Sequence, residues 1–177
     1  MIITETNLLG LHVIKSKPFG DDRGYFERRF CSKELKKHGL RFEMDQVNKN
    51  FNVSSGTLRG LHFQNQPFSE TKVVQCTSGS IQDVVVDIRT NSPTYLQHFS
   101  IVLTEQNGIS LFIPKGFAHG YLSLEDNSAA LYMVDQGYEP NSEGGIRFDD
   151  PKLQINWMHS IEEISEKDQS WPYLVDS

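Results

Sequence analysis

Residues 58–64 bring together side chains that could move a proton next to negative charge. The segment reads Leu-Arg-Gly-Leu-His-Phe-Gln, so that Arg59 and His62 stand three residues apart in an otherwise apolar stretch, and Lys72 follows them. Histidine titrates near neutral pH, which suits a general base. A base accompanied by two cations indicates proton transfer on an anionic substrate.

The surrounding sequence predicts short β-strands that would position these side chains. Runs rich in β-branched and aromatic residues are separated by clusters of Gly, Asn, Ser and Pro, which is the pattern of strands joined by tight turns. Many short strands with hairpin-sized connections favour an all-β sandwich or barrel over a parallel nucleotide-binding sheet. The predicted strands are residues 58–63, 72–77, 81–88, 99–103, 109–113 and 129–134, and the turn candidates are 78–80 and 105–108.

Two short helices are expected outside the strands. The stretch from Ser32 to Gly39 begins with a typical N-cap residue, ends with a helix-stopping glycine and has lysines near its negative end. Ser160 and Glu163 have the spacing of a capping box, which predicts a helix in the C-terminal tail. We expect one domain over residues 1–177, with a β core of about residues 1–157 and a helical appendage over about 158–177.

The composition is typical of a globular protein and argues against two kinds of partner. The chain has 177 residues, of which 37% are hydrophobic and 23% charged, and apolar runs such as 129–134 are far shorter than the ~20 residues that span a bilayer. The net charge of −6 and the lack of a long basic cluster argue against nucleic-acid binding. We expect no membrane association, free thiols at Cys31 and Cys76, and, since the first residues do not resemble a signal peptide, a cytoplasmic location.

Half of a cupin-type metal signature is present. Residues 108–119 fit the pattern Gly-x5-Pro-x-Gly-x2-His, which ends at His119 and is typical of a turn between two barrel strands. The other half requires His-x-His followed by Glu, whereas this chain has His62-Phe63-Gln64. An amide is a poor substitute for an imidazole, so too few ligands remain for a metal ion. The expectation is a jelly-roll barrel without metal.

Five motifs spread over nearly the whole chain indicate together what kind of protein this is. They are Asp21-Asp-Arg-Gly-Tyr-Phe26, Gly56-Thr-Leu-Arg-Gly-Leu-His-Phe-Gln64, Pro114-Lys-Gly-Phe-Ala-His-Gly120, Tyr138-x-Pro-x2-Glu-x-Gly-Ile146 and Ser165-Glu-Lys-Asp168. In order and spacing they resemble the dTDP-4-dehydrorhamnose 3,5-epimerase family. The resemblance implies an all-β, cupin-type antiparallel jelly roll with short C-terminal helices, no metal and no cofactor. It also implies a homodimer that inverts the carbons beside the ketone of a nucleotide-diphosphate-linked 4-keto-6-deoxy sugar.

Four residues receive catalytic roles from this chemistry and from the resemblance. A hydrogen next to a ketone becomes acidic only if the enolate oxygen is stabilised, and Lys72 is the expected source of positive charge. His62 is the expected base, and the resemblance implies that Asp168 holds its other ring nitrogen. Inversion needs a proton from the opposite face, and Tyr132 occupies the family's position for that acid.

The resemblance also implies a set of substrate-binding residues. The planar guanidinium of Arg59 suits the oxygens of a diphosphate. The other matching positions are Arg23, Phe26, Gln46, Asn48, His119, Tyr138, Glu143 and Lys167. Each assignment has a simpler alternative: His62 could be a core histidine, Tyr132 a half-buried strand tyrosine, and Asp168 a helix-capping acid three residues after Ser165.

The chain departs from the family at positions that recognise the base. Where the family usually has an acid four residues after the equivalent of Gly24, this chain has Arg28, and the family's Gln-Asp-Asn run is replaced by Gln-Val-Asn-Lys at 46–49. The nucleotide therefore stays open between dTDP and GDP, and a GDP-linked 4-keto-6-deoxy-heptose is an alternative substrate. Inversion of C3 alone or of both C3 and C5 stays open as well.

Two other classes of function stay in view. A cupin ketoisomerase moves the carbonyl between C4 and C3 and usually has a second histidine close to the His62 position, where this chain has Gln64 and Asn65. The other class is a sugar-nucleotide-binding protein without turnover. Loss of product with unchanged ligand affinity after replacement of His62 and Tyr132 would distinguish an enzyme from such a binder.

The N-terminal residues predict an assembly. Jelly rolls leave exposed sheet edges, and the strand-like residues here are Ile2, Ile3, Leu11, Val13 and Ile14. We expect this region to pair with a second copy in a two-fold homodimer.

Overall fold

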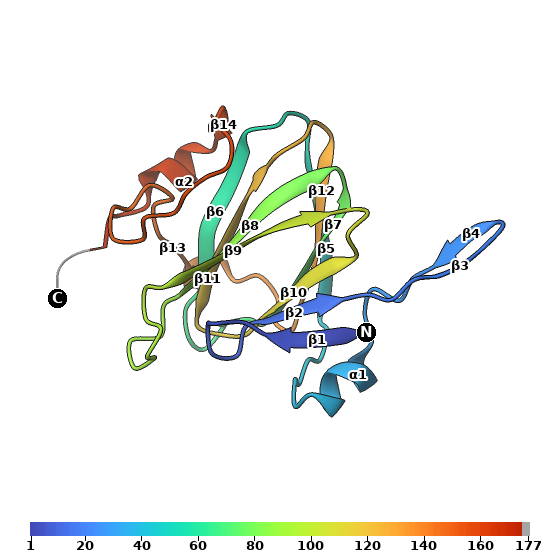
Figure 1. The fold of residues 1–177 in the computed structure, drawn as a ribbon. Coiled ribbons are helices and arrows are strands. Elements are labelled where there is room, and N and C mark those ends of the chain that lie inside the picture. Colours follow the sequence, from blue (N-terminus) through green and yellow to red (C-terminus); the bar gives the residue numbers. More distant parts are fainter. Residues whose placement is uncertain (175–177) are drawn as a thin grey trace.

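Two largely antiparallel β-sheets face each other in the computed structural model, which describes residues 1–174 (Figure 1). The strands of the first sheet follow the order β1-β2-β10-β7-β12-β5. Their bounds are β1 Ile2–Glu5, β2 His12–Lys15, β10 Ile109–Ile113, β7 Lys72–Ser78, β12 Ser128–Val134 and β5 Gln46–Asn52.

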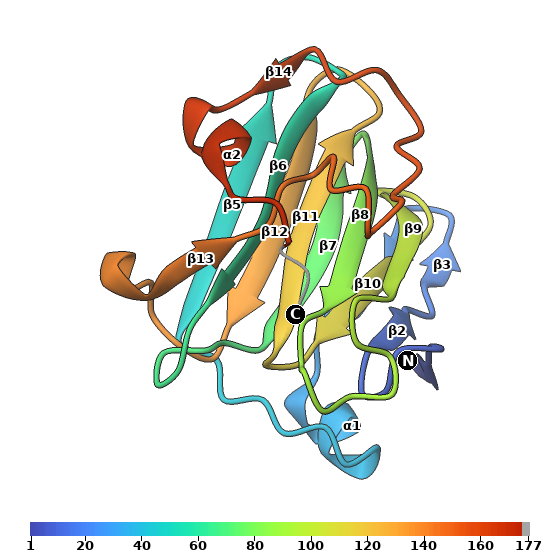
Figure 2. The ribbon, with the colours of Figure 1, turned by 90° about the vertical axis from the view of Figure 1, so that its left-hand side faces the viewer.

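The second sheet follows the order β13-β6-β11-β8-β9, and β14 pairs in parallel with β6. Its strands are β13 Glu143–Gly145, β6 Thr57–Gln64, β11 Phe117–Ser123, β8 Ser80–Asp87, β9 His98–Thr104 and β14 Glu163–Ile164. Figure 2 shows this sheet from its outer side, with the C-terminal segment lying across it. The remaining elements are the hairpin of β3 Phe19–Asp21 and β4 Gly24–Phe26, the helices α1 Ser32–Lys37 and α2 Glu166–Ser170, and the 3-10 turn η1 Pro140–Ser142.

The predicted antiparallel jelly roll is confirmed. All six predicted strands are present with ends shifted by at most one residue, as β6, β7, β8, β9, β10 and β12. Both predicted turns contain a glycine with positive φ, Gly79 at 65° and Gly108 at 63°, a conformation that glycine adopts without steric cost. Both cysteines are free thiols, as expected.

Strands β5 and β11 were not predicted, and two helix caps differ from the prediction. Ser32 is the first residue of α1, and the cap position belongs to Cys31. The capping box at Ser160 and Glu163 is wrong, because Glu163 lies in β14 and α2 begins only after its cap Ser165. The Ser160 hydroxyl instead donates to Glu162 at 2.6 Å. Glu163 pairs with β6 as part of β14 and is therefore not in a helical turn.

Apolar clusters fill the space between the sheets and cover the outer face of each. Val74 and Leu111 from the first sheet pack against Val85 of the second sheet in the inner cluster. Outside the first sheet lies a cluster that includes Leu35 of α1, and outside the second sheet lies one that includes Val84 and the C-terminal segment. Both faces of β8 are therefore covered, which explains why all of its residues are buried and why valines stand at three consecutive positions, 84–86, without the alternation of a half-exposed strand.

The β3–β4 hairpin projects away from the two sheets (Figure 1). Phe19, Tyr25 and Phe26 on this hairpin are 69%, 65% and 62% exposed. Aromatic side chains gathered on a projecting arm form an apolar surface of the kind that monomers rarely leave uncovered. We call residues 19–26 the arm.

The described part of the chain, residues 1–174, contains no helix that is long and apolar enough to cross a membrane. The helices α1 and α2 have six and five residues. Their role is to cover sheet faces and, for α2, to carry a residue of the site described next.

Candidate functional site

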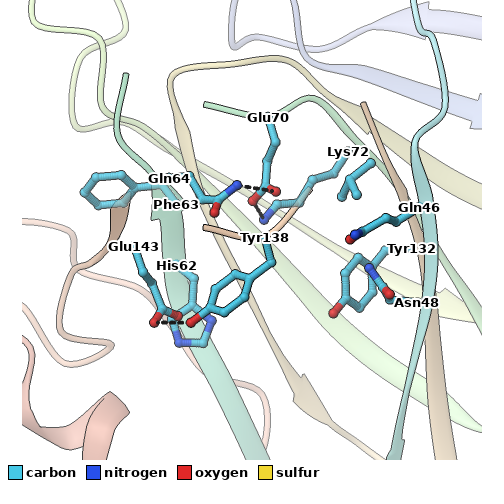
Figure 3. Close-up of a pocket in the computed structure, with 11 residues that line it drawn as sticks. Gln46, Asn48, His62, Phe63, Gln64, Glu70, Lys72, Tyr132, Tyr138 and Glu143 are labelled. Atoms are coloured by element: carbon cyan, nitrogen blue, oxygen red, sulfur yellow. Dashed lines mark hydrogen bonds and ion pairs between the residues drawn. The ribbon is translucent and has the colours of Figure 1, made fainter. Parts of the chain in front are cut away.

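His62 and Tyr132 face one cavity from opposite sheets. His62 belongs to β6 of the second sheet and Tyr132 to β12 of the first sheet, and both line connected cavities of about 260 Å³ and about 750 Å³. Figure 3 shows His62 near Tyr138 and Glu143 on one side of the pocket, and Tyr132 with Asn48 and Gln46 on the other. The space between the sheets at this end is thus an open pocket lined by polar groups.

A bulge in β6 turns Arg59 and His62 to the same side. Along β11, His119 pairs with His62 and Tyr121 pairs with Arg59, so three steps on β6 match two steps on β11. Side chains alternate along a regular strand, and residues three apart would face opposite sides. Gly60 at the bulge has a φ of 127°, and a Cβ there would lie 2.5 Å from the Cα of Gly120. Only glycine allows this close approach of the two strands.

The first sheet contributes its side chains by regular alternation. On β12, Val134 pairs with Lys72 on one side and with Gln46 on the other. Two residues earlier on the same strand, Tyr132 pairs with Asn48. Residues two apart on a strand share a face, which places Lys72, Tyr132, Gln46 and Asn48 on the inner face. The polar sequence of β5 is explained by this arrangement, because its alternate residues line the pocket rather than the core.

The imidazole of His62 is held by a carboxylate. Its Nε2 lies 2.6 Å from Oδ1 of Asp168 on α2, and Oδ2 of Asp168 accepts a hydrogen bond from the backbone N–H of Gly60 at 3.2 Å. With Nε2 occupied, Nδ1 is the ring nitrogen left to exchange a proton with a substrate. Trp171 packs edge-on against the imidazole, with ring centroids 6.3 Å apart.

Asp168 is buried and stays charged. Burial alone raises the pKa of a carboxyl group, but the hydrogen bond and charge of His62 and the N–H of Gly60 outweigh it and lower the pKa of Asp168. Its backbone N–H donates to the hydroxyl of Ser165, the N-cap of α2, at 3.1 Å. Asp168 therefore occupies the position of a helix-capping acid and also contacts the imidazole, so the two alternatives derived from the sequence are both met.

Tyr132 is kept as a phenol. Burial raises the pKa of Tyr132, and the negative charge of Glu70 raises it further, while Arg59 acts in the opposite direction. A protonated phenol can donate a proton to a carbanion, which a phenolate cannot. The environment of Tyr132 therefore fits an acid.

Lys72 does not stand alone. Its ammonium contacts one carboxylate oxygen of Glu70, and the other oxygen accepts from Nε2 of Gln64 at 3.1 Å (Figure 3). The side chains of Lys72 and Glu70 are only 13% and 11% exposed. The predicted cation is present in the pocket, and it is paired.

Arg59 is the cation of the pocket without an acidic partner. Its Nε donates to Oδ1 of Asn52 at 2.9 Å, and the hydroxyl of Tyr121 reaches the same oxygen at 3.3 Å. Among residues 1–174 no carboxylate lies within ion-pair distance of Arg59. Its terminal nitrogens are therefore left for an anionic ligand.

Four further predicted residues lie deeper in the pocket or at its rim. His119 lines a smaller cavity of about 80 Å³ with Arg59 and Tyr132, and its Nε2 lies 2.9 Å from Oδ2 of the fully buried Asp83. At the rim, Glu143 accepts from Lys167 at 2.7 Å and from the hydroxyl of Tyr138 at 3.0 Å. Burial raises the pKa of Glu143, but these two hydrogen bonds and the charge of Lys167 lower it overall.

Arg23 and Phe26 are the predicted residues that do not join the others. Both belong to the arm, which points away from the pocket of its own chain (Figure 1). Arg23 pairs with Asp21 on the same hairpin at 2.6 Å, and its side chain is 89% exposed. The remaining predicted residues, Gln46, Asn48, Arg59, His62, Lys72, His119, Tyr132, Tyr138, Glu143, Lys167 and Asp168, all line the three connected cavities.

Several residues of the pocket were missed by sequence reasoning. Glu70 precedes Lys72 by two positions, a spacing that places residues on one face of a strand and could have drawn attention to it. Gln64 belongs to the motif at 56–64 but received no role of its own. Asn52 and Trp171 carry no such signal, because what they do is visible only in their contacts with Arg59 and His62. Within residues 1–174 no group of three or more His, Cys, Asp or Glu side chains is arranged to hold a metal ion.

Comparison with known proteins relates the whole chain to one kind of enzyme. The sequence profile described as dTDP-4-dehydrorhamnose 3,5-epimerase matches residues 5–176. An enzyme of this name from Sinorhizobium fredii is 38% identical over 177 residues, covering 99% of this chain and 91% of the relative. The crystal structure of a dTDP-4-dehydrorhamnose 3,5-epimerase from Bacillus anthracis with TDP and PPi bound is similar with a TM-score of 0.95 at 36% identity, covering 98% of this chain and 99% of that chain. The structure of dTDP-6-deoxy-D-glucose-3,5-epimerase from Legionella pneumophila in complex with dTDP-4-keto-L-rhamnose has a TM-score of 0.91 at 36% identity and covers 99% and 94% of the two chains.

Proposed function

This chain belongs to the dTDP-4-dehydrorhamnose 3,5-epimerase family, and we propose that it inverts C3, C5 or both in a nucleotide-linked 4-keto-6-deoxy sugar. The observation that carries the proposal is the pair of His62 and Tyr132 on opposite walls of one cavity. A sugar ring between them would meet a base on one face and an acid on the other. Inversion of a carbon requires this arrangement.

The reaction begins at a carbon next to the C4 ketone. Nδ1 of His62 takes the proton, and the electron pair of the C–H bond moves toward the carbonyl oxygen to give an enolate. Asp168 stabilises the imidazolium that forms and holds the ring in place. The ammonium of Lys72 stabilises the enolate oxygen, a contribution that amounts to several kcal/mol in a site shielded from water.

The second half of the reaction returns a proton from the other side. Tyr132 donates its phenolic proton to the carbanionic carbon, the enolate collapses to the ketone, and the configuration is inverted. Tyr132 then regains a proton and His62 releases one by exchange with solvent, which reaches both residues through the open cavity of about 750 Å³. The reaction consists of two proton transfers at one carbon, without a net oxidation or reduction. His62, Tyr132 and Lys72 supply the base, the acid and the positive charge that these transfers require.

The nucleotide handle is bound outside the sugar site. Arg59 is proposed to hold the diphosphate, with His119 and Lys167 nearby, while Gln46 and Asn48 face the sugar or the base. TDP in the Bacillus anthracis enzyme and dTDP-4-keto-L-rhamnose in the Legionella pneumophila enzyme favour a dTDP sugar as the first substrate to test. The GDP-linked heptose remains the alternative to compare with it.

We propose further that the arm completes the pocket of a second copy in a homodimer. Arg23 and Phe26 match family positions at the substrate, yet they lie away from the pocket of their own chain and are exposed. The exposed aromatics of the arm and the outward-facing Val47 and Phe51 of the edge strand β5, at 52% and 51%, are apolar surface that such a dimer would cover. β1 pairs with β2 of its own chain and forms one edge of the first sheet. The expected pairing of the N-terminal region with a second copy would therefore add the partner's strand beside β1.

The proposed setting is one domain acting in the cytoplasm. The C-terminal segment packs on the second sheet through β14 and α2 rather than forming a separate unit. The free thiols of Cys31 and Cys76 suit a reducing compartment.

Deuterium incorporation tests the proposed function. The protein is incubated in deuterated water with the dTDP, GDP, UDP and CDP forms of a 4-keto-6-deoxy sugar, and the products are followed by NMR. We expect deuterium at C3, and at C5 if both centres react. Absence of exchange with all four nucleotides would overturn the proposal.

Variants separate the competing functions. His62→Asn is expected to abolish exchange while the substrate still binds with a similar dissociation constant. A ketoisomerase would yield a 3-keto sugar instead of a C3 epimer, which the same NMR spectra distinguish. If a sugar nucleotide raises the melting temperature of the wild-type protein but no deuterium exchange follows, the protein is a binder without turnover.

A further inference from the structure

Glu70 divides its carboxylate between two residues of the pocket. One oxygen contacts the ammonium of Lys72 and the other accepts from Nε2 of Gln64 at 3.1 Å. Glu70 lies just before β7, and its side chain lines the pocket between the sheets (Figure 3). A nearly buried ion pair thus forms part of the wall where the sugar ketone is expected.

Gln64 fixes the orientation of this carboxylate. Its amide nitrogen is also within hydrogen-bonding distance of the carbonyls of Phe68 and Gly137, at 3.0 and 3.2 Å, and its amide oxygen accepts from the backbone N–H of Glu139 at 2.6 Å. The buried amide cannot turn without breaking these contacts. Glu70 is therefore aimed at Lys72 by a side chain that is itself locked to the backbone.

Lys72 needs such a partner for geometric reasons. The ammonium sits on a flexible four-carbon stem and can point in many directions, whereas a group that stabilises an enolate must be held within about 0.5 Å of its productive position. One N–H of Lys72 directed at Glu70 leaves two for the pocket. The carboxylate thus restricts the lysine without using all of its donors.

The pair also shapes the charge of the pocket. Lys72 is neutralised by Glu70 and Lys167 by Glu143, while Arg59 has no carboxylate partner among the described residues. An anionic diphosphate is therefore attracted to Arg59 rather than to Lys72. The neutral keto sugar is left to occupy the end at Lys72.

We infer that Glu70 is a positioning residue: it holds the ammonium of Lys72 toward the sugar carbonyl and keeps that ammonium from binding the diphosphate. The inference rests on the proposed function and adds to it a residue outside the motifs of the chain. Its proximity to Tyr132, whose pKa it helps to raise, places it beside both the cation and the acid of the reaction.

Two measurements on Glu70→Ala test this role. We expect kcat to fall by about tenfold to a hundredfold with KM changed little. Binding of inorganic diphosphate, measured by calorimetry, should become tighter by about threefold to tenfold, because the freed ammonium can reach the anion. An unchanged kcat, or weaker binding of diphosphate, would overturn the inference, since a merely structural defect does not improve anion binding.

A second variant shows whether the effect runs through Lys72. In Glu70→Ala/Lys72→Ala the tighter binding of diphosphate should disappear, and tight binding that persists would contradict the proposed route. The control Glu34→Ala removes the carboxylate that pairs with Lys37 on α1, and it should change neither measurement. An absence of turnover in the wild type would count against the proposed function. The diphosphate-binding measurement would still test the effect of Glu70 on Lys72, because inorganic diphosphate carries neither sugar nor base.

Discussion

Nε2 of His62 and Oδ1 of Asp168 lie 2.6 Å apart although 106 positions separate them in the sequence. Two short elements bring them together. β14 pairs in parallel with β6, the strand of His62, and α2 follows directly after Ser165, which caps it. The C-terminal segment is therefore part of the site, and its docking on β6 sets the orientation of the base.

Asp168→Asn should reduce kcat by about a hundredfold to ten-thousandfold. An amide keeps the shape of the side chain, but it cannot stabilise an imidazolium and can favour the wrong tautomer of His62. Initial rates with the sugar nucleotide identified by deuterium exchange measure the effect. Glu166→Gln changes an exposed carboxylate on the same helix and should leave kcat unchanged. Equal rates in Asp168→Asn and wild type would show that His62 works without its partner.

Gly60→Ala should lower the free energy of unfolding by about 3 kcal/mol or more. The added Cβ would lie 2.5 Å from the Cα of Gly120 and 2.9 Å from the carbonyl oxygen of His119, and backbone atoms cannot move aside cheaply. Urea unfolding measures the change. Gly39→Ala is the matched control, because its φ is also positive at 76° but nothing lies within 4 Å of the added atom. It should cost only the conformational penalty of about 1–2 kcal/mol.

Local sequence patterns predicted the strands well where they build the core. The runs at 81–88 and 109–113 each contain three consecutive apolar residues, because both faces of these two strands are buried. β5 was missed because its polarity is reversed: Asn48 and Asn50 point inward to a pocket, while the apolar Val47 and Phe51 face outward and are about half exposed. A strand that lines a polar cavity lacks the buried apolar face on which such predictions depend.

The site could be predicted only in part, because its geometry depends on contacts between distant segments. Simple alternation would have placed Arg59 and His62 on opposite faces, and only the bulge against β11 brings them to one side. The role of Asp168 came from the resemblance to a family, since nothing in its own segment points to His62. Glu70 was not singled out, because a carboxylate near a lysine is common on protein surfaces and its burial is visible only in the fold.

Asp87→Asn should destabilise the protein in a pH-dependent way. Burial raises the pKa of Asp87, but hydrogen bonds from Arg89, Ser92 and Thr94 outweigh it and hold the pKa well below its usual range. A carboxyl with a lowered pKa in the folded state contributes stability that is full above its unfolded pKa of about 3.9 and is lost as the pH falls through the folded value. The variant should lose about 1–3 kcal/mol at pH 7. Urea unfolding should show this gap shrinking below about pH 4, and a gap that stays constant would contradict the assignment.

Arg23→Ala and His62→Asn should complement each other in mixed dimers. Each variant alone is expected to have a large loss of activity. If the arm of one copy reaches the pocket of the other, a mixed dimer has one intact pocket, formed by His62 of the first variant and Arg23 of the second. Equal mixing after joint refolding or co-expression should then restore about a quarter of wild-type activity, because about half of the dimers are mixed and each has one working site of two.

The alternative arrangement of the arm predicts a different result. If Arg23 served the pocket of its own chain, no mixed dimer would contain an intact site, and mixing would restore nothing. Light scattering on the same samples checks that dimers form. Lys37→Ala provides the control, because Lys37 is exposed on α1 and its loss should leave the subunit active. Mixing it with His62→Asn measures the activity of dimers that contain one active and one inactive subunit.

Tyr132→Phe should separate proton removal from inversion. His62 and Lys72 remain in place, so the base can still form the enolate, but the phenol that would deliver a proton from the opposite face is gone. The enolate is then reprotonated by the imidazolium on the face from which the proton left. We expect deuterium to enter the recovered substrate at a rate within about tenfold of that of the wild type, while formation of the epimer falls by about a hundredfold or more. Proton exchange at the imidazole accounts for the label, because His62 lines an open cavity. Loss of both exchange and inversion would mean that the phenol also helps to form the enolate, and undiminished inversion would remove Tyr132 from the mechanism.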